Sequence, residues 1–161
     1  TGSAALCQSQ PVPIALDESA YTLQDVGNIV RMQAADYVLL DPHQAGGLWQ
    51  VIKAAALCEA VGIPAGLHSG AELAISQAAY LHLAASIPNM TLAIDTERAY
   101  LAGDVAPDAP VLRDGAFDVP QAPGLGVTPD EALIERYKVT EIAGAYLDSD
   151  RPSWFPTKPA Y

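Results

Sequence analysis

The sequence is poor in basic residues, in aromatic residues and in cysteine. Only 8 of the 161 residues are Lys or Arg, against 19 Asp or Glu, which gives a formal net charge of −11. A chain of this charge lacks the basic surface with which proteins bind nucleic acid or an anionic membrane, so we expect neither as a partner. An acidic substrate is still compatible with it, because a bound metal ion can invert the local field.

The two cysteines, Cys7 and Cys58, are far apart and form no C-x-x-C motif. Cys58 stands in an apolar run, so we expect a buried thiol there rather than half of a disulfide. The sequence also has no uncharged run long enough to cross a bilayer, and no basic segment followed by a long apolar one, as in a signal peptide. These absences favour a reducing, cytoplasmic setting.

Half of the residues are apolar and 17% are charged, which is typical of a globular domain with a hydrophobic core. Up to about residue 100, short apolar runs alternate with longer segments of helical spacing. The strand candidates are residues 13–16, 37–40, 63–68 and 91–94. Strands that alternate with helices in this way predict parallel βαβ units with right-handed crossovers.

The segments between the strand candidates carry helix signals. Thr22 can cap the first helix, whose apolar residues recur with helical spacing. Gly46 and Gly47 precede the second helix, and Gly62 is suited to end it. A third helix, rich in Ala, Ile and Leu, is predicted over about residues 72–85.

Prolines punctuate the chain after residue 100. Asp114 and Gly115 stand between two short apolar runs and predict a β-hairpin. Thr128 as cap, with Pro129 at the first helical position, predicts a helix that ends near Tyr137. The last stretch is aromatic and Pro-rich, and we expect it to pack on a surface rather than form a regular element.

Acidic, basic or metal-binding side chains follow the C-terminal end of every strand candidate. They are Asp17 with Glu18, Asp41, His68, and Asp95 with Glu97. The first residues of successive groups are 24, 27 and 27 positions apart. Because the carboxyl ends of parallel strands share one edge of a sheet or one mouth of a barrel, we expect these side chains to converge on one site. One Asp at a strand end is more often a helix cap, but four consecutive strand ends are harder to explain in that way.

Several stretches of this sequence resemble a known family. The resemblance is carried by PIALDES, ADYVLLDPHQAGGL, GIPAGLHSGAELAISQAAYLHLAASIPN and PGLGV. In content and order they are similar to the second half of the mandelate racemase and muconate-lactonizing branch of the enolase superfamily. The resemblance implies an α/β fold, the C-terminal half of a modified TIM-type (β/α)7β barrel. Residues 1–100 would hold barrel strands five to eight with their helices, and residues 101–161 a hairpin, a helix and an extended tail packing toward a capping domain.

The resemblance also implies a Mg²⁺-dependent reaction. Members of this family hold the metal through carboxylates on the third, fourth and fifth strands, and the metal stabilises the enediolate formed when the proton beside a carboxylate is removed. Asp17 matches the fifth-strand ligand of the muconate-lactonizing and epimerase members. Glu18 is the alternative, if the racemase pattern is followed.

Asp41 and His68 match the aspartate and histidine of the family's catalytic dyad. In that reading Asp41 orients the imidazole and raises its basicity, and His68 moves the proton near neutral pH. The lactonizing enzymes and the dipeptide epimerases have a lysine where Asp41 stands, which counts against both activities. We expect the Asp41 and His68 side chains to lie within hydrogen-bond reach of each other at one barrel mouth.

Two short runs, LLDPH and LAIDT, are similar to the glucarate dehydratase group. They favour dehydration of a sugar acid, with Asp95, Glu97 and His43 as substrate-binding residues. The sequence departs from that group at Asp17, where an asparagine is expected, and at Gly46-Gly47, where bulkier residues stand. A different sugar acid is therefore the expected substrate.

Other interpretations stay open at this point. The reaction can be racemization or epimerization of an α-hydroxy acid, and the chain can be a non-catalytic half-barrel that binds a ligand or partner. Length alone favours an open, flavodoxin-like α/β domain. If the resemblance holds, we expect the first four strands, two further metal ligands, a second base and the capping domain to come from the rest of the enzyme or from a partner chain. We also expect a homo-oligomer.

Overall fold

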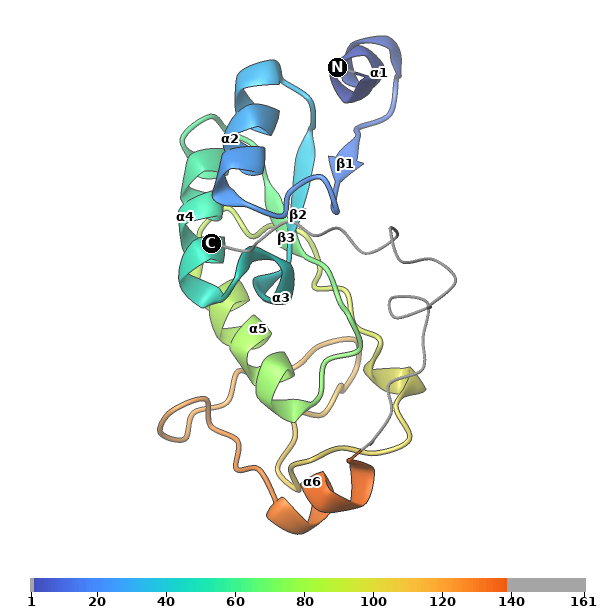
Figure 1. Ribbon diagram of the computed structural model, residues 1–161, viewed down its shortest axis with the longest axis vertical. Coiled ribbons are helices and arrows are strands. Elements are labelled where there is room, and N and C mark those ends of the chain that lie inside the picture. The colour runs from blue at the N-terminus through green and yellow to red at the C-terminus, as the bar shows by residue number, and fades with distance from the viewer. Residues whose placement is uncertain (1, 139–161) are drawn as a thin grey trace.

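The structure is a computed structural model that describes residues 2–138 (Figure 1). Its elements, in chain order, are α1 (Gly2–Ser9), β1 (Ala15–Leu16), α2 (Leu23–Met32), β2 (Tyr37–Leu40), α3 (Pro42–Ala45), α4 (Leu48–Glu59), β3 (Ala65–Leu67), α5 (Ala74–Ser86), the 3-10 helix η1 (Arg98–Tyr100) and α6 (Glu131–Tyr137). The predicted extended tail lies outside the described residues. Within residues 2–138, no helix is long and apolar enough to cross a membrane.

The three strands form one parallel sheet in the order β1-β2-β3. Ala15 pairs with Tyr37, and Val38 pairs with Ala65. Helices α2 and α4 lie side by side against the sheet, with α5 below them in the view of Figure 1. In a flavodoxin-like sheet the first strand lies between the second and third, whereas here β2 is central. The strand order therefore fits successive strands of a barrel and counts against the open fold.

The fourth predicted strand, residues 91–94, forms no ladder in the structure. The segment touches β3 at its two ends, where Ala65 N donates to Asn89 O at 2.9 Å and Asp95 N donates to Leu67 O at 3.3 Å. Between these points Thr91 N turns back to Asn89 O at 3.0 Å, so a local turn interrupts the pairing. The segment is nevertheless placed beside β3, and it brings Asp95 to the carboxyl end of the sheet.

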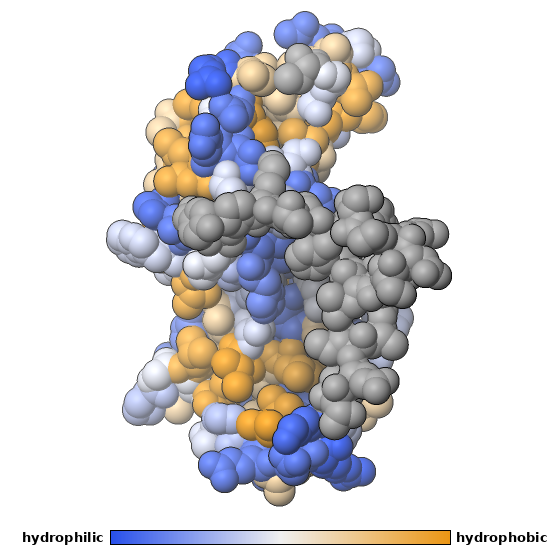
Figure 2. Space-filling view, viewed as in Figure 1, coloured by the Kyte–Doolittle hydropathy of each residue, from blue (hydrophilic) through white to orange (hydrophobic). Residues whose placement is uncertain are grey.

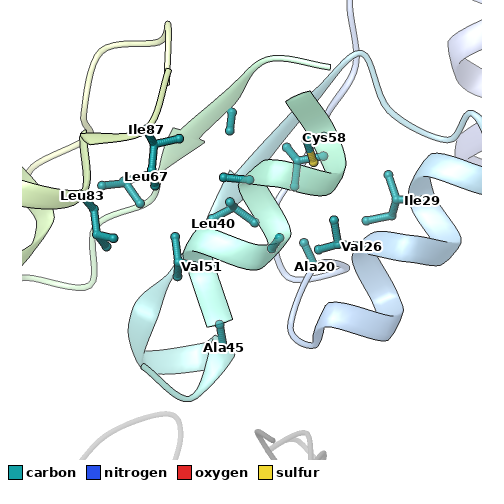
Figure 3. Close-up of a cluster of buried hydrophobic side chains, with 14 of the residues drawn as sticks. Ala20, Val26, Ile29, Leu40, Ala45, Val51, Cys58, Leu67, Leu83 and Ile87 are labelled. Carbon is teal, nitrogen blue, oxygen red and sulfur yellow. The ribbon is translucent and has the colours of Figure 1, made fainter. Parts of the chain in front are cut away.

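The core lies between the strands and helices α2, α4 and α5 (Figure 3). Val26, Leu40, Val51 and Leu67 are at most 1% exposed. Burying each such side chain contributes about 1.5–3 kcal/mol of transfer free energy. Cys58 is a free thiol with 0% exposure, as predicted, and burial raises its pKa to about 11.

Two of the predicted helix starts are confirmed in atomic detail. Thr22 caps α2, since its hydroxyl accepts from Asp25 N at 3.1 Å while Thr22 N donates to the Asp25 carboxylate at 3.0 Å. Gly46 and Gly47 have φ values of 86° and 115°, a region that glycine enters without steric cost, and α4 begins directly after them.

Of the predictions for the C-terminal part, the hairpin is confirmed and the helix cap is wrong. Asp114 and Gly115 have φ values of 50° and 78°, and Arg113 and Ala116 exchange two backbone hydrogen bonds of 2.9 Å, so the hairpin is a single bridged turn. The predicted cap Thr128 is wrong. Its N–H donates to Asp108 at 3.0 Å, and the side chain of Asp130 caps α6 instead.

Large apolar side chains also reach the surface. Figure 2 shows hydrophobic residues exposed both in the part that holds α1 and α2 and in the part near α6. Trp49 is 67% exposed and Val12 is 61% exposed in the described chain. These side chains lie outside the core that positions the site.

Candidate active site at the carboxyl edge of the sheet

Three of the predicted site residues meet around one imidazole ring. Nε2 of His68 lies 3.6 Å from Oδ2 of Asp17, and Nδ1 of His68 lies 3.4 Å from Oδ2 of Asp95. Asp17 follows β1, and His68 follows β3. The backbone N–H of His68 donates to Leu40 O at 3.2 Å. The convergence of strand ends expected from the spacing is thus present for these three residues.

Asp17 occupies an electrostatically unfavourable position. Its Oδ1 is buried and has no hydrogen-bond partner within the part of the chain that the structure describes. Burial raises the pKa of Asp17, and the neighbouring carboxylates of Glu18 and Asp41 raise it further, although His68 opposes them. A divalent cation at this carboxylate would offset both the cost of burying its negative charge and the repulsion from its neighbours, so Asp17 fits the role of a metal ligand. Residues 2–138 contain no group of three or more His, Cys, Asp or Glu side chains placed to hold a metal ion, so Asp17 would be one ligand of a larger set.

Asp41 is engaged in a different set of contacts from the one expected. Its side chain is 6% exposed, and Oδ1 accepts from His43 N at 2.7 Å, which caps α3. The same oxygen accepts from the Tyr80 hydroxyl at 2.8 Å and lies 3.1 Å from Nδ1 of His43. No hydrogen bond or ion pair joins Asp41 to His68 in the described residues, and Oδ1 of Asp41 instead contacts residues of α3 and α5. The catalytic role of Asp41 stays a prediction.

Tyr80 is the partner of Asp41 that the sequence pattern did not reveal. It lies in α5, is 1% exposed, and donates its hydroxyl proton to Oδ1 of Asp41. Burial raises the pKa of Tyr80 above its ordinary value, and the hydrogen bond to Asp41 adds to this effect. The available signal was the residue type, since a buried tyrosine in an aliphatic helix requires a partner for its hydroxyl group.

The loop after β3 is held by a second buried pair, Ser69 and Glu72. They are 2% and 4% exposed, and the Ser69 hydroxyl donates to the Glu72 carboxylate at 2.5 Å. Ser69 Oγ also accepts from Glu97 N at 3.1 Å, which fixes the backbone of Glu97 beside this loop. The S-x-x-E spacing was a recognisable signal for this pair.

Asp104 anchors the start of α5 from the C-terminal part of the chain. Its carboxylate accepts from Ala74 N at 3.0 and 3.1 Å and forms an ion pair with Arg98. Burial alone would raise the pKa of Asp104, but hydrogen bonds from Ala74 and Val105 and the charge of Arg98 outweigh it and hold the pKa below its usual value. The helix that carries Tyr80 is therefore tied to the segment that follows Glu97.

A sheet of successive parallel strands, with carboxylates and an imidazole gathered at its carboxyl edge, defines the chain as part of an α/β-barrel scaffold with an acid–base cluster at the mouth. The family model described as enolase C-terminal domain-like matches residues 1–133, and the chain belongs to this family.

The proteins to which this chain is similar belong to more than one reaction class. The chain is 31% identical over 139 residues to a probable glucarate dehydratase of Streptomyces coelicolor, covering 86% of this chain and 31% of that protein. It is 32% identical over 144 residues to an N-succinylamino acid racemase of an Amycolatopsis species, covering 88% of this chain and 38% of that protein. The solved structure of muconate lactonizing enzyme from Pseudomonas putida superposes with a TM-score of 0.78 at 29% identity, over 84% of this chain and 38% of that one. The chain thus spans about a third of the length of these relatives.

Proposed function

We propose that this chain forms part of a Mg²⁺-dependent enzyme that removes the proton beside the carboxylate of a hydroxy acid or sugar acid. The observation that supports this most strongly is the placement of His68 between Asp17 and Asp95 at the carboxyl edge of the sheet. Residues outside this chain would supply the further metal ligands. Belonging to the enolase C-terminal domain-like family supports the same reaction class.

In this proposal His68 is the group that takes the proton. The Asp95 carboxylate, 3.4 Å from Nδ1, favours the tautomer that carries its proton on Nδ1. Nε2 then presents a lone pair, and its 3.6 Å separation from Asp17 is too long for a hydrogen bond that would occupy it. Asp17 would hold Mg²⁺, with Glu18 as the alternative ligand, and a bound Mg²⁺ would supply positive charge beside the substrate carboxylate.

Dehydration of a sugar acid is the reaction we favour. After taking the α-proton, protonated His68 can return a proton to the β-hydroxyl group as it leaves as water. His43, Asp95 and Glu97 would contact the substrate. The LLDPH and LAIDT runs and the similarity to a probable glucarate dehydratase support this choice. The sequence differs from the glucarate dehydratase group at Asp17 and at Gly46-Gly47, which favours a sugar acid other than glucarate as the substrate.

Racemization is the second candidate, because an N-succinylamino acid racemase is equally similar to this chain. Racemization requires a second base on the opposite face of the substrate, whereas dehydration requires a β-hydroxyl group placed to leave. The two reactions share proton removal and differ in the product.

The test uses the full-length protein that contains this chain, with Mg²⁺ and a panel of aldonic and aldaric acids. We expect a 2-keto-3-deoxy product, detected as its semicarbazone, and its loss in His68→Asn. His82→Asn is the matched control and should retain turnover, since His82 hydrogen bonds to Leu125 O away from the cluster. Inversion without loss of water would instead establish a racemase. Absence of both products across the panel would favour the non-catalytic binding module.

A further inference from the structure

A second set of side chains, separate from the ring of His68, has the order carboxylate, imidazole, hydroxyl. Oδ1 of Asp41 lies 3.1 Å from Nδ1 of His43, and Nε2 of His43 lies 3.2 Å from Oγ of Ser76. These residues come from the end of β2, from α3 and from the first turn of α5. The order and the distances are those of a serine activated by a histidine that an aspartate holds in place.

The contacts around His43 fix which ring nitrogen carries the proton. Nδ1 of His43 lies 3.1 Å from Oδ1 of Asp41 and 3.1 Å from the Tyr80 hydroxyl oxygen. Because the Tyr80 hydroxyl donates its own proton to Asp41, both of these oxygens can accept, which places the His43 proton on Nδ1. Nε2 is then an acceptor, and the Ser76 hydroxyl donates its proton to it. This is the protonation pattern in which the histidine can act as a general base toward the serine.

Asp41, at one end of this arrangement, is buried, whereas the His43 side chain is exposed to solvent. The Asp41 side chain is 6% exposed and is held by the Tyr80 hydroxyl at 2.8 Å and by His43 N at 2.7 Å. The His43 side chain is 55% exposed, and Ser76 is half-buried beside it. A substrate would therefore meet Ser76 at the surface rather than inside a cavity, which favours small, activated acyl groups.

The position of Ser76 in α5 adds a way to stabilise negative charge. The helix begins at Ala74, whose N–H is taken by Asp104. The N–H groups of Ile75 and Ser76 belong to the same first turn, where the helix itself offers no acceptor. Such donors, at the positive end of the helix dipole, favour a developing oxyanion beside Ser76.

We propose that Asp41, His43 and Ser76 form a second nucleophilic site, which hydrolyses small activated carboxylic esters through an acyl-serine. The Ser76 oxygen bonds to the ester carbonyl carbon as His43 takes its proton, and His43 passes that proton to the departing alkoxide. Water then attacks the acyl-serine, with His43 again taking and returning a proton, so an acid and an alcohol are released and Ser76 is restored. The site shares Asp41 with the predicted dyad and His43 with the proposed substrate contacts, but it needs neither Mg²⁺ nor His68.

The test uses the full-length protein that contains this chain. In one assay the protein reacts with a fluorophosphonate probe, and mass spectrometry maps the labelled residue. In the other, hydrolysis of p-nitrophenyl acetate is measured. We expect labelling at Ser76 and its loss in Ser76→Ala. We also expect His43→Gln to lower both the labelling rate and the ester turnover by about 100-fold or more, in line with removal of a general base. Ser86→Ala is the matched control, because Ser86 lies in the same helix and its hydroxyl donates to Leu83 O at 3.1 Å, so both rates should be unchanged.

Three outcomes would overturn the proposal. One is labelling that maps to a residue other than Ser76 or does not occur. Another is ester hydrolysis that continues at the same rate in Ser76→Ala, which would assign it to an exposed imidazole or amine acting alone. The third is a His43→Gln variant that labels as fast as the unaltered chain.

Discussion

The βα part of the chain, residues 13–97, and the C-terminal part, residues 101–138, are held in place by different interactions. The first has a continuous apolar core that includes Val26, Leu40 and Val51. In the second, only Ala106 and Pro110 are buried. The C-terminal part is attached through polar contacts, such as His82 with Leu125 O at 3.1 Å and Ala74 N with the Asp104 carboxylate at 3.0 Å.

This difference shows how the site is positioned. The core fixes the strand ends that carry Asp17, Asp41 and His68. The C-terminal part contributes single hydrogen-bonded anchors, of which Asp104 at the start of α5 is the most embedded. We therefore expect substitutions in the core to lower the stability of the whole unit, and substitutions in the C-terminal part to act locally.

The largest effect should come from truncating a core side chain. Leu40→Ala removes a side chain that is 1% exposed, and we expect the free energy of unfolding to fall by about 2–5 kcal/mol. Leu112→Ala is the matched control, because Leu112 is 47% exposed and its loss should cost no more than about 0.5 kcal/mol. Urea unfolding of the two variants measures both values, and similar losses in the two would remove the distinction between the parts.

The next effect concerns the hydrogen bond between Tyr80 and Asp41. Tyr80→Phe keeps the ring but leaves a buried carboxylate without one donor, and we expect a loss of about 1.5–3 kcal/mol. Tyr100→Phe, at a side chain that is 86% exposed, should have no measurable effect on stability. Thermal unfolding compares the two, and a Tyr80→Phe variant as stable as Tyr100→Phe would show that this contact contributes nothing to the core.

A smaller, pH-dependent effect is expected at Asp104. At neutral pH, Asp104→Ala removes the cap of α5 and should cost about 0.5–2 kcal/mol. Because the pKa of Asp104 is lowered in the folded state, its contribution is fully present above the unfolded-state pKa and is lost as the pH falls through the folded-state value. The gap between the two proteins should therefore begin to close below about pH 4. Unfolding measured from pH 7 to pH 3 gives the gap, and a gap that widened toward acid would contradict the sign of the shift.

The smallest effect should come from the hairpin. Gly115 has a φ of 78°, so Gly115→Ala should cost about 1 kcal/mol locally, although an added Cβ meets no atom within 4 Å. The same substitution at Gly27, inside α2 and also in open space, should instead stabilise the chain by about 0.5–1 kcal/mol. Opposite signs in the two unfolding midpoints are the expected result. Two shifts of the same sign would show that backbone conformation does not control these sites.

The local sequence pattern was sufficient to predict those elements whose determining residues lie close together in the sequence. The strand Tyr37–Leu40 has the predicted bounds, and Thr22 caps α2 through Asp25, three positions away. The carboxyl-edge cluster of Asp17, His68 and Asp95 followed from strand-end spacing, because parallel strands bring their carboxyl ends together.

Contacts between distant segments could not be obtained in this way. Tyr80 reaches Asp41 from 39 positions away, and no local spacing shows that Oδ1 of Asp41 faces α5. The strand predicted over residues 91–94 depends on pairing along its whole length, which a turn at Asn89 and Thr91 interrupts. The cap of α6 was misplaced for a related reason: the backbone N–H of Thr128 donates to Asp108, 20 positions away, and Asp130 caps the helix instead.

The central claim is that His68, placed between Asp17 and Asp95, removes a proton beside a carboxylate. The most direct measurement is exchange of the α-hydrogen of sugar acids with deuterium from D₂O, followed by proton NMR, in the full-length protein with Mg²⁺. We predict exchange in the unaltered protein and in His82→Asn, and its loss in His68→Asn and in Asp17→Asn. Exchange that proceeds at the same rate in His68→Asn would contradict the assignment of the base.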